Sequence, residues 1–243
     1  SFSRFFAFEE GTARTAEAAR PHAAVPLRLM PAGDAADLMR KYGLPALEAP
    51  LAASAEEAVA HFRKMGGPAV MKIASPDVPH KSDAGGVRLH LATEGEVRKA
   101  YGKILSSVRK KLPGAKIEGV TLSPMAKPGT EVILGVITDV QYGPCLMFGL
   151  GGIFTEVYRD VQFSLLPADE REFLRMIEGI RGYPLLTGIR GQGAKDVPAL
   201  VAAMKGLARV VRDHRGIDQI DLNPVIVYDK GLAVVDCRIY TRQ

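Results

Sequence analysis

Residues 69–91 read AVMKIASPDVPHKSDAGGVRLHL, and this stretch decides the fold. Two apolar runs, AVMKI (69–73) and VRLHL (87–91), predict strands. The segment between them contains two prolines and two glycines and predicts a loop over 74–86. Lys72 lies inside the first apolar run, where a lysine must face solvent or meet an anion, because burying an unpaired charge is costly.

The loop favours the anion for Lys72 over a merely solvated strand face. Ser82, Gly85 and Gly86 are small residues that let backbone amides approach phosphates, although the sequence GxxxxGK[ST] is absent. His80 lies in the same loop, where a lone histidine is usually only solvated. Few apolar side chains are expected to anchor the loop, which predicts that it is mobile.

Periodicity and helix caps extend the pattern along the chain. Capping boxes are expected at Ser54 with Glu57 and at Thr93 with Glu96, and Asp34 and Asp196 are expected N-caps. Helices are predicted over 34–43, 54–66, 93–112, 168–179 and 197–213. Strands are predicted over 118–125, 130–139, 145–149, 155–166, 217–228 and 232–240. The result is an α+β chain whose strands pair mostly through hairpins, without the regular alternation of a doubly wound sheet.

The last two predicted strands flank a turn at 229–231 and carry hard oxygen ligands. Asp221 and Asn223 are two residues apart and therefore face one side of the same strand. Pairing across the turn can bring Asp236 close to them. Two carboxylates and an amide, together with phosphate oxygens, form a normal Mg²⁺ environment. Exposed polar groups on a strand are the alternative interpretation.

A glycine cluster, FGLGGIFTE, occupies 148–156. A dinucleotide-binding fingerprint needs glycine where Phe154 stands and a helix after it, and neither condition is met. The cluster instead predicts a tight bend that lets a nucleotide or another backbone come close.

Composition excludes several classes of function. The 243 residues are 47% hydrophobic and 24% charged, with a net charge of +5. Aromatic residues make up 7% and do not alternate with basic ones, so nucleic acid binding is not expected. A phosphate-rich small ligand accounts for the positive charge equally well. No apolar stretch reaches the roughly 20 residues of a membrane span. Cys145 and Cys237 lie in apolar runs and are expected to be reduced thiols in the cytoplasm.

Several long motifs in fixed order resemble the nucleotide-binding part of the NDP-forming acyl-CoA synthetases, the succinyl-CoA synthetase superfamily. They are KIASPDVPHKSDAGGV (72–87), GTEVILGVITDVQYGPCLMFGLGGIFTEVYRD (129–160), LLTGIRG (185–191), IDLNPVIV (220–227) and VVDCRI (234–239). The resemblance implies an ATP-grasp fold, in which two α+β lobes enclose a nucleotide cleft. The expected lobes are 31–124 and 125–243, after a linker or tail over 1–30.

The resemblance also implies roles for individual residues. Lys72 matches the phosphate-binding lysine, and Glu131 matches a carboxylate near the ribose and adenine. Asn223 and Asp236 match the magnesium ligands, and Asp221 occupies a position that is usually acidic. The hinge along the adenine is formed by Ser123, Pro124 and Met125.

The implied activity is that of an ADP-forming acid–CoA ligase that uses ATP and Mg²⁺. Phosphate would pass through a histidine of a CoA-binding partner, and His80 matches the loop of a second relay histidine. The CoA-binding and ligase domains are missing from the sequence, so the partner would be a separate subunit or a fused domain. Ser1 and the linker-like start favour a fusion or a trimmed chain.

Two other functions are compatible with the residues. An ATP-grasp carboxylate–amine ligase would make acyl phosphate in its own cleft, and a non-catalytic regulatory module would only bind nucleotide.

Overall fold

The computed structural model describes residues 26–78, 80–152, 160–189 and 193–242. The chain divides into two compact units. The small unit contains residues 32–36 and 47–127. The large unit contains the residues before 32, residues 37–46 and residues 128–243. The described helices include none that is long and apolar enough to cross a membrane.

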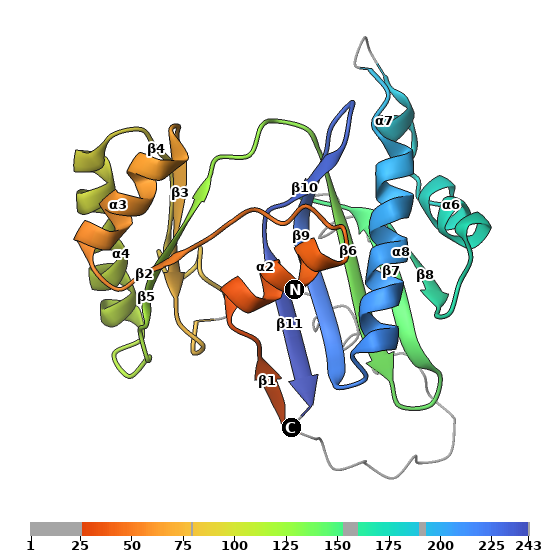
Figure 1. Ribbon diagram of the computed structural model, residues 1–243, viewed down its shortest axis with the longest axis horizontal. Coiled ribbons are helices and arrows are strands. Elements are labelled where there is room, and N and C mark those ends of the chain that lie inside the picture. Colours follow the sequence, from red (N-terminus) through yellow and green to blue (C-terminus); the bar gives the residue numbers. More distant parts are fainter. Residues whose placement is uncertain (1–25, 79, 153–159, 190–192, 243) are drawn as a thin grey trace. The chain divides into compact units, whose positions relative to one another are not determined.

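The small unit is a four-stranded antiparallel sheet packed against two helices (Figure 1). The strand order is β2-β5-β3-β4, and each neighbouring pair is antiparallel. Met71, Leu122 and Ile104 are fully buried in the core between sheet and helices. The elements are β2 (Leu51–Ala52), α3 (Ala55–Met65), β3 (Ala69–Ala74), β4 (Val87–Leu91), α4 (Glu94–Lys111) and β5 (Gly119–Pro124).

Both predicted helix starts in this unit carry a side-chain cap. Thr93 accepts a hydrogen bond from the Glu96 N–H at 3.2 Å, and the Glu96 carboxylate accepts one from the Thr93 N–H at 3.1 Å. Ser54 accepts from the Glu57 N–H at 3.1 Å, while the Glu57 carboxylate accepts from Ala53, one residue before the cap. The capping box is therefore confirmed at Thr93 and takes a variant form at Ser54.

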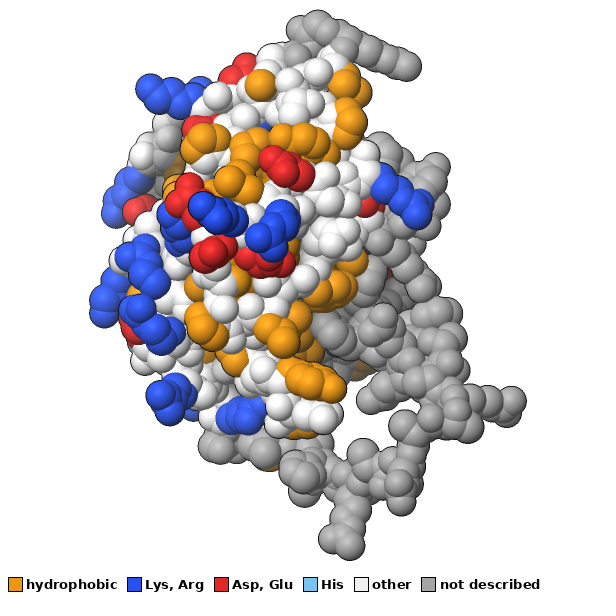
Figure 2. All heavy atoms as spheres, turned by 90° about the vertical axis from the view of Figure 1, so that its right-hand side faces the viewer, with side chains coloured by type: hydrophobic (Ala, Val, Ile, Leu, Met, Phe, Trp, Pro, Cys, Tyr) orange, Lys and Arg blue, Asp and Glu red, His pale blue; other side chains and the backbone are white. Residues whose placement is uncertain are grey.

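The large unit is built on an antiparallel sheet in the order β1-β11-β9-β6-β7-β8, with β10 also paired to β9. Helices α6 and α8 lie together against one side of it (Figure 1). Acidic and basic side chains stand next to one another on the surface seen in Figure 2, and Lys205 of α8 pairs with Glu170 of α6. The strands are β1 (Leu27–Leu29), β6 (Thr130–Asp139), β7 (Gly143–Leu150), β8 (Val161–Leu165), β9 (Ile217–Val227), β10 (Leu232–Val234) and β11 (Cys237–Arg242). The helices assigned wholly or partly to this unit are α2 (Ala32–Lys41), α6 (Glu170–Glu178), α7 (Pro184–Thr187) and α8 (Val197–Asp213).

The structure differs from the sequence predictions at several boundaries. Helix α2 begins at Ala32 with Pro31 as its N-cap, so Asp34 lies in the first turn instead of capping it. Residues 27–29, expected in a linker, pair with the last strand as β1. The short helix α7 was not predicted. The final strand divides into β10 and β11, and residues 155–159 of the predicted strand 155–166 lie outside the described residues.

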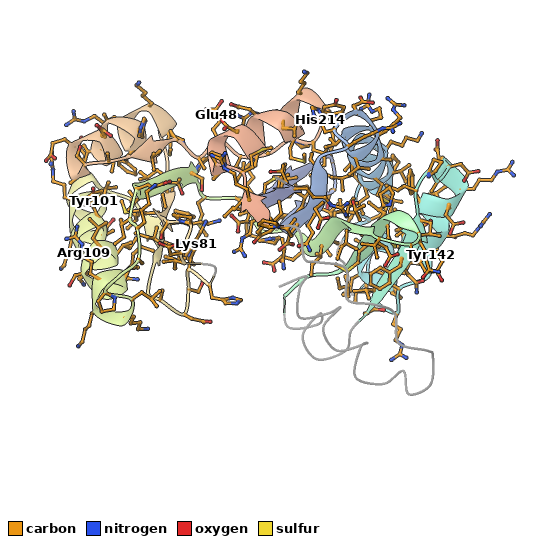
Figure 3. All side chains as sticks on the ribbon, turned by 90° about the horizontal axis from the view of Figure 1, so that it is seen from below. Glu48, Lys81, Tyr101, Arg109, Tyr142 and His214 are labelled. Atoms are coloured by element: carbon orange, nitrogen blue, oxygen red, sulfur yellow. The ribbon has the colours of Figure 1, made fainter. Side chains whose placement is uncertain are left out.

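The segment that follows α2 packs with the large unit. Leu44 is fully buried, and a Cβ on Gly206 of α8 would lie 2.6 Å from its Cδ1, so glycine is needed for this close approach. The Tyr42 hydroxyl donates to Asp213 at 3.0 Å and lies 3.2 Å from Nε2 of His214, which is labelled in Figure 3. The predicted lobe 31–124 therefore contains ten residues, 37–46, that belong to the other compact unit.

The loop between β3 and β4, which carries Lys81 in Figure 3, is anchored by apolar side chains. Val78 is 2% exposed and Ala84 is 6% exposed, and both belong to the core of the small unit. The Asp77 carboxylate accepts a hydrogen bond from the Lys116 N–H at 2.7 Å. Two apolar side chains of the loop, Val78 and Ala84, therefore anchor it to the core, and its expected mobility stays a prediction.

Gly86 closes the loop, and its replacement tests the packing. A Cβ there would lie 2.5 Å from Cγ2 of Ile73 and 2.9 Å from the Lys81 carbonyl oxygen. We predict that Gly86→Ala lowers the free energy of unfolding by about 2 kcal/mol, because backbone must shift to make room. Gly67→Ala is the matched control, since its Cβ would meet nothing within 4 Å. Urea unfolding monitored by circular dichroism measures both, and equal stability of the two variants would contradict the packing described.

Candidate nucleotide- and metal-binding site

Lys72 projects from the side of β3 that faces away from the helices. Its neighbours Met71 and Ile73 are fully buried in the core, whereas Lys72 is half-buried. Lys72 is directly across from Thr121 of β5 and Val87 of β4. Side chains directly across a sheet share a face, so the ammonium group belongs to a surface that also carries the Thr121 hydroxyl.

The predicted hinge residues begin on that same face. Ser123 lies two residues after Thr121 and is only 5% exposed. Pro124 ends β5, and the Met125 N–H donates to the Pro68 carbonyl at 2.8 Å. The structure thus brings Lys72, Thr121 and Ser123 together. Thr121 was missed by the sequence reasoning, although a threonine in the apolar run VTL is the signal that could have identified it.

The loop after β3 places His80 and Ser82 at the surface of the small unit, where both are exposed. The Gly85 N–H donates to the Ser82 carbonyl at 2.9 Å, and the Gly86 N–H donates to the Lys81 carbonyl at 2.7 Å. These two amides are therefore engaged inside the loop. The glycines permit the tight turn, with Gly85 at a φ of 72°, where a side chain would be strained.

Glu131 lies near the start of β6 with its side chain exposed. The Gly151 N–H donates to the Glu131 carbonyl at 2.8 Å, and a Cβ on Gly151 would lie 2.9 Å from Cβ of Glu131. The glycine cluster therefore allows close approach of another backbone, one of the two possibilities that its sequence left open. Residues 153–156 of that cluster lie outside the described residues.

The closing hairpin places the predicted magnesium ligands together. The Tyr228 N–H donates to the Gly231 carbonyl at 3.0 Å and closes the predicted turn. The Asn223 N–H donates to the Asp236 carbonyl at 3.2 Å, so Asn223 on β9 lies across from Asp236, the residue just before β11. Asp221 lies two residues before Asn223 and shares its face. The backbone of Asp236 thus lies beside that of Asn223, and the charge of Asp236 raises the pKa of Asp221. That these three side chains hold magnesium stays a prediction.

The surroundings of Asp221 are unusual for a carboxylate. Burial raises the pKa of Asp221, the positive charge of Arg238 opposes that increase, and the charge of Asp236 adds to it. The Oδ1 atom of Asp221 is buried and has no hydrogen-bond partner in the described part of the chain. Arg238 lies directly across from Asp221 and pairs with Asp236 at 3.5 Å. Sequence reasoning missed Arg238, although its spacing of two from Asp236 predicts a shared strand face.

The oxygen atoms of this cluster suit a magnesium ion. Two carboxylates and one amide are hard ligands, and Mg²⁺ needs few protein ligands because it retains water and binds phosphate oxygens. The buried, unpartnered oxygen of Asp221 is a further group that a cation or its water could satisfy. Within the described ranges, His, Cys, Asp and Glu alone form no group of three or more that could hold a metal.

Comparison with known proteins agrees with this geometry. Residues 26–240 match the model of the ATP-grasp domain. The chain is 43% identical over 209 residues to the beta subunit of acetate–CoA ligase [ADP-forming] II of Pyrococcus furiosus, across 85% of this chain and 89% of the relative.

Two solved structures of Ca. Korarchaeum cryptofilum dinucleotide forming acetyl-coenzyme A synthetase 1 are also similar. One, in complex with coenzyme A and Ca-AMPCP, is 40% identical, with a TM-score of 0.86 and coverage of 100% of both chains. The other contains coenzyme A and Mg-AMPPCP, with a phosphohistidine segment pointing towards the nucleotide binding site. It is 42% identical, with a TM-score of 0.75 over 86% of this chain and 91% of that chain. The chain therefore belongs to the ATP-grasp family, among the relatives of the beta subunits of ADP-forming acetate–CoA ligases.

Proposed function

We propose that this chain is the ATP- and Mg²⁺-binding component of an ADP-forming acyl–CoA synthetase. The complete enzyme joins a small carboxylic acid to CoA and converts ATP into ADP and phosphate. The observation that carries the proposal is the closing hairpin, in which Asn223 lies across from Asp236. The P. furiosus beta subunit and the K. cryptofilum structure with Mg-AMPPCP support it.

We assign nucleotide-binding roles to individual residues of the chain. The charge of Lys72 binds and neutralises phosphate oxygens, because a cation stabilises the charge that develops during phosphoryl transfer. Glu131 binds the ribose and adenine, and the segment Ser123–Met125 runs along the adenine. Ser82 is the loop residue assigned to the phosphates. Gly85 and Gly86, also expected there from the sequence, shape the loop instead, because their amides donate to carbonyl groups within it.

Asn223 and Asp236 are the proposed magnesium ligands, with Asp221 beside them. A bound Mg²⁺ bridges phosphate oxygens and offsets their charge. The protein contributes by holding Asn223 on β9 across from Asp236, just before β11, where a backbone hydrogen bond fixes the separation of the two residues before any ion binds.

Phosphoryl transfer requires a CoA-binding partner. A neutral nitrogen of His80 attacks the γ-phosphorus, the bond to the bridging oxygen breaks, and ADP leaves. A neutral histidine of the partner then attacks the phosphorus on His80, and the N–P bond to His80 breaks as the partner takes the phosphoryl group. The phosphohistidine passes its phosphate to the carboxylate, and the CoA thiol then displaces phosphate from the acyl phosphate. We assign His80 as a second, relaying histidine, which its exposed position in the small unit supports.

A reducing, cytoplasmic location completes the proposal. Cys145 and Cys237 are both free and half-buried. Burial raises the pKa of both thiols above the usual range, and the nearby charges of Asp236 and Asp221 raise that of Cys237 further. Both therefore remain protonated and weakly reactive near neutral pH.

Omitting one component at a time tests the function. We predict that the chain together with a CoA-binding partner releases ADP only when ATP, a small carboxylic acid such as acetate, and CoA are all present. A coupled ADP assay measures the rate. ADP release that needs an amine instead of CoA would identify a carboxylate–amine ligase, and nucleotide binding with no turnover would identify a regulatory module.

The metal ligands are tested by calorimetry with and without Mg²⁺. We predict that Asn223→Ala and Asp236→Ala weaken Mg·ATP binding by about tenfold or more, while ATP binding in EDTA changes little, because the ligands act through the ion. Asp229→Asn is the matched control, since Asp229 is an exposed acid in the same hairpin that pairs with Lys195. An equal loss with and without Mg²⁺ would show that the two residues are not metal ligands.

The relay is tested by incubating the chain with γ-labelled ATP and the CoA-binding partner. We predict acid-labile, base-stable label on this chain, which His80→Ala abolishes while ATP still binds. His90→Asn is the control. His90 is also an exposed histidine and lies in β4, the strand after the loop, and asparagine tolerates its φ of 57°. Label confined to the partner, with full turnover in His80→Ala, would eliminate the relay.

A further inference from the structure

Arg238 shares a strand face with the proposed magnesium ligands but is not one of them. It follows Asp236, the residue just before β11, by two residues, and the side chains of the two form an ion pair. Its direct cross-strand partner on β9 is Asp221. Cross-strand partners lie close enough for their side chains to interact. One guanidinium group is therefore within reach of two carboxylates.

The two contacts of Arg238 differ in kind. Nη2 of Arg238 lies 3.5 Å from Oδ2 of Asp236, with the side chains 23% and 21% exposed, which makes a loose ion pair rather than a hydrogen bond. The charge of Arg238 lowers the pKa of Asp221, yet the buried Oδ1 of Asp221 accepts no hydrogen bond from the residues that the structure describes. A buried, unpartnered carboxylate oxygen is costly, so the cluster retains one unfilled acceptor beside a donor-rich side chain.

A second arginine of β11 forms a close ion pair with an acid of β9 and serves as a comparison for Arg238. Nε of Arg242 donates to Oδ1 of Asp218 at 2.6 Å, and Asp218 is only 8% exposed. Arg238 and Arg242 both belong to β11, and Asp218 and Asp221 both belong to β9. Arg242 thus makes a short hydrogen bond to Asp218, whereas the contact of Arg238 with Asp236 is longer, at 3.5 Å.

The charges of the three side chains give a physical reason for the long contact between Arg238 and Asp236. Asp221, Asp236 and Arg238 together carry a net charge of about −1 when ionised. A divalent ion at Asp236 would be repelled by a guanidinium that stayed there. Movement of that group towards Asp221 would remove the repulsion and fill the empty acceptor.

We infer that Arg238 occupies the place of the metal: it pairs with Asp236 while the ion is absent and moves onto Oδ1 of Asp221 when Mg²⁺ binds Asp236. Arg238 is then a positioning residue that offsets the repulsion between the carboxylates of Asp221 and Asp236, both with and without the ion. The inference rests on the proposed function, because it takes Asp236 as a metal ligand.

Manganese binding to the nucleotide-free full chain tests the inference, with the free ion measured by electron paramagnetic resonance. If Arg238 competes with the ion, Arg238→Gln should bind Mn²⁺ at least about threefold more tightly, since a nearby positive charge has been removed. Arg238→Lys keeps the charge and should show less than half of that gain. Arg242→Gln removes the second arginine of the same strand and should leave Mn²⁺ affinity unchanged.

A second measurement does not depend on whether Arg238→Gln folds. In wild-type chain labelled with ¹⁵N-arginine, Mg²⁺ should shift the Nε–H signal of Arg238, identified by its absence from Arg238→Lys, and leave that of Arg242 in place. An unmoved Arg238 signal, or Mn²⁺ affinity in Arg238→Gln no higher than in wild type, would overturn the inference.

Asp236→Asn separates this inference from the function on which it rests. Loss of Mn²⁺ binding in Asp236→Asn without tighter binding in Arg238→Gln would remove only the role of Arg238. Undiminished Mn²⁺ binding in Asp236→Asn would show that the proposed metal site itself is wrong.

Discussion

The register between β9 and β11 is the constraint on which the candidate site depends. Backbone pairing sets Asn223 across from Asp236 and Asp221 across from Arg238. A shift of one residue would turn every one of these side chains to the opposite face, where Leu222 and Ile239 are fully buried. The apolar side of the same strands therefore fixes the polar side, because the core and the oxygen ligands alternate along one backbone.

The small unit uses the same alternation around Lys72. Met71 and Ile73 hold β3 in the core, and Lys72 must then point away from the helices, towards the face of Thr121. In both units, buried apolar residues alternate with polar ones along a strand, so the burial of the apolar residues fixes the side to which the charged group points.

Sequence alone predicted what local pattern controls. The strands 69–73 and 87–91, the cap at Thr93 and the turn at 229–231 follow from periodicity and cap chemistry, and all occur in the structure. The resemblance supplied Glu131, which no pattern in the residues would have identified.

The features that escaped prediction depend on contacts between distant residues. Strand β1 exists because β11 lies beside it, and a strand of three residues is too short for periodicity to predict that pairing. The anchoring of the loop by Val78 and Ala84 depends on a core assembled from other elements. Arg238 needed the observed register before its relation to Asp221 could be recognised.

The path of the chain through the two compact units has a consequence for biosynthesis. Residues 47–127 of the small unit are contiguous, whereas the large unit joins the start of the chain to its end. Strand β1 needs β11, and Tyr42 and Leu44 need α8. On a ribosome, the small unit can collapse around its own short-range contacts while later residues are still being added. The large unit must wait for α8, β9 and β11, so segments 27–29 and 37–46 remain without their partners until those later elements have been made.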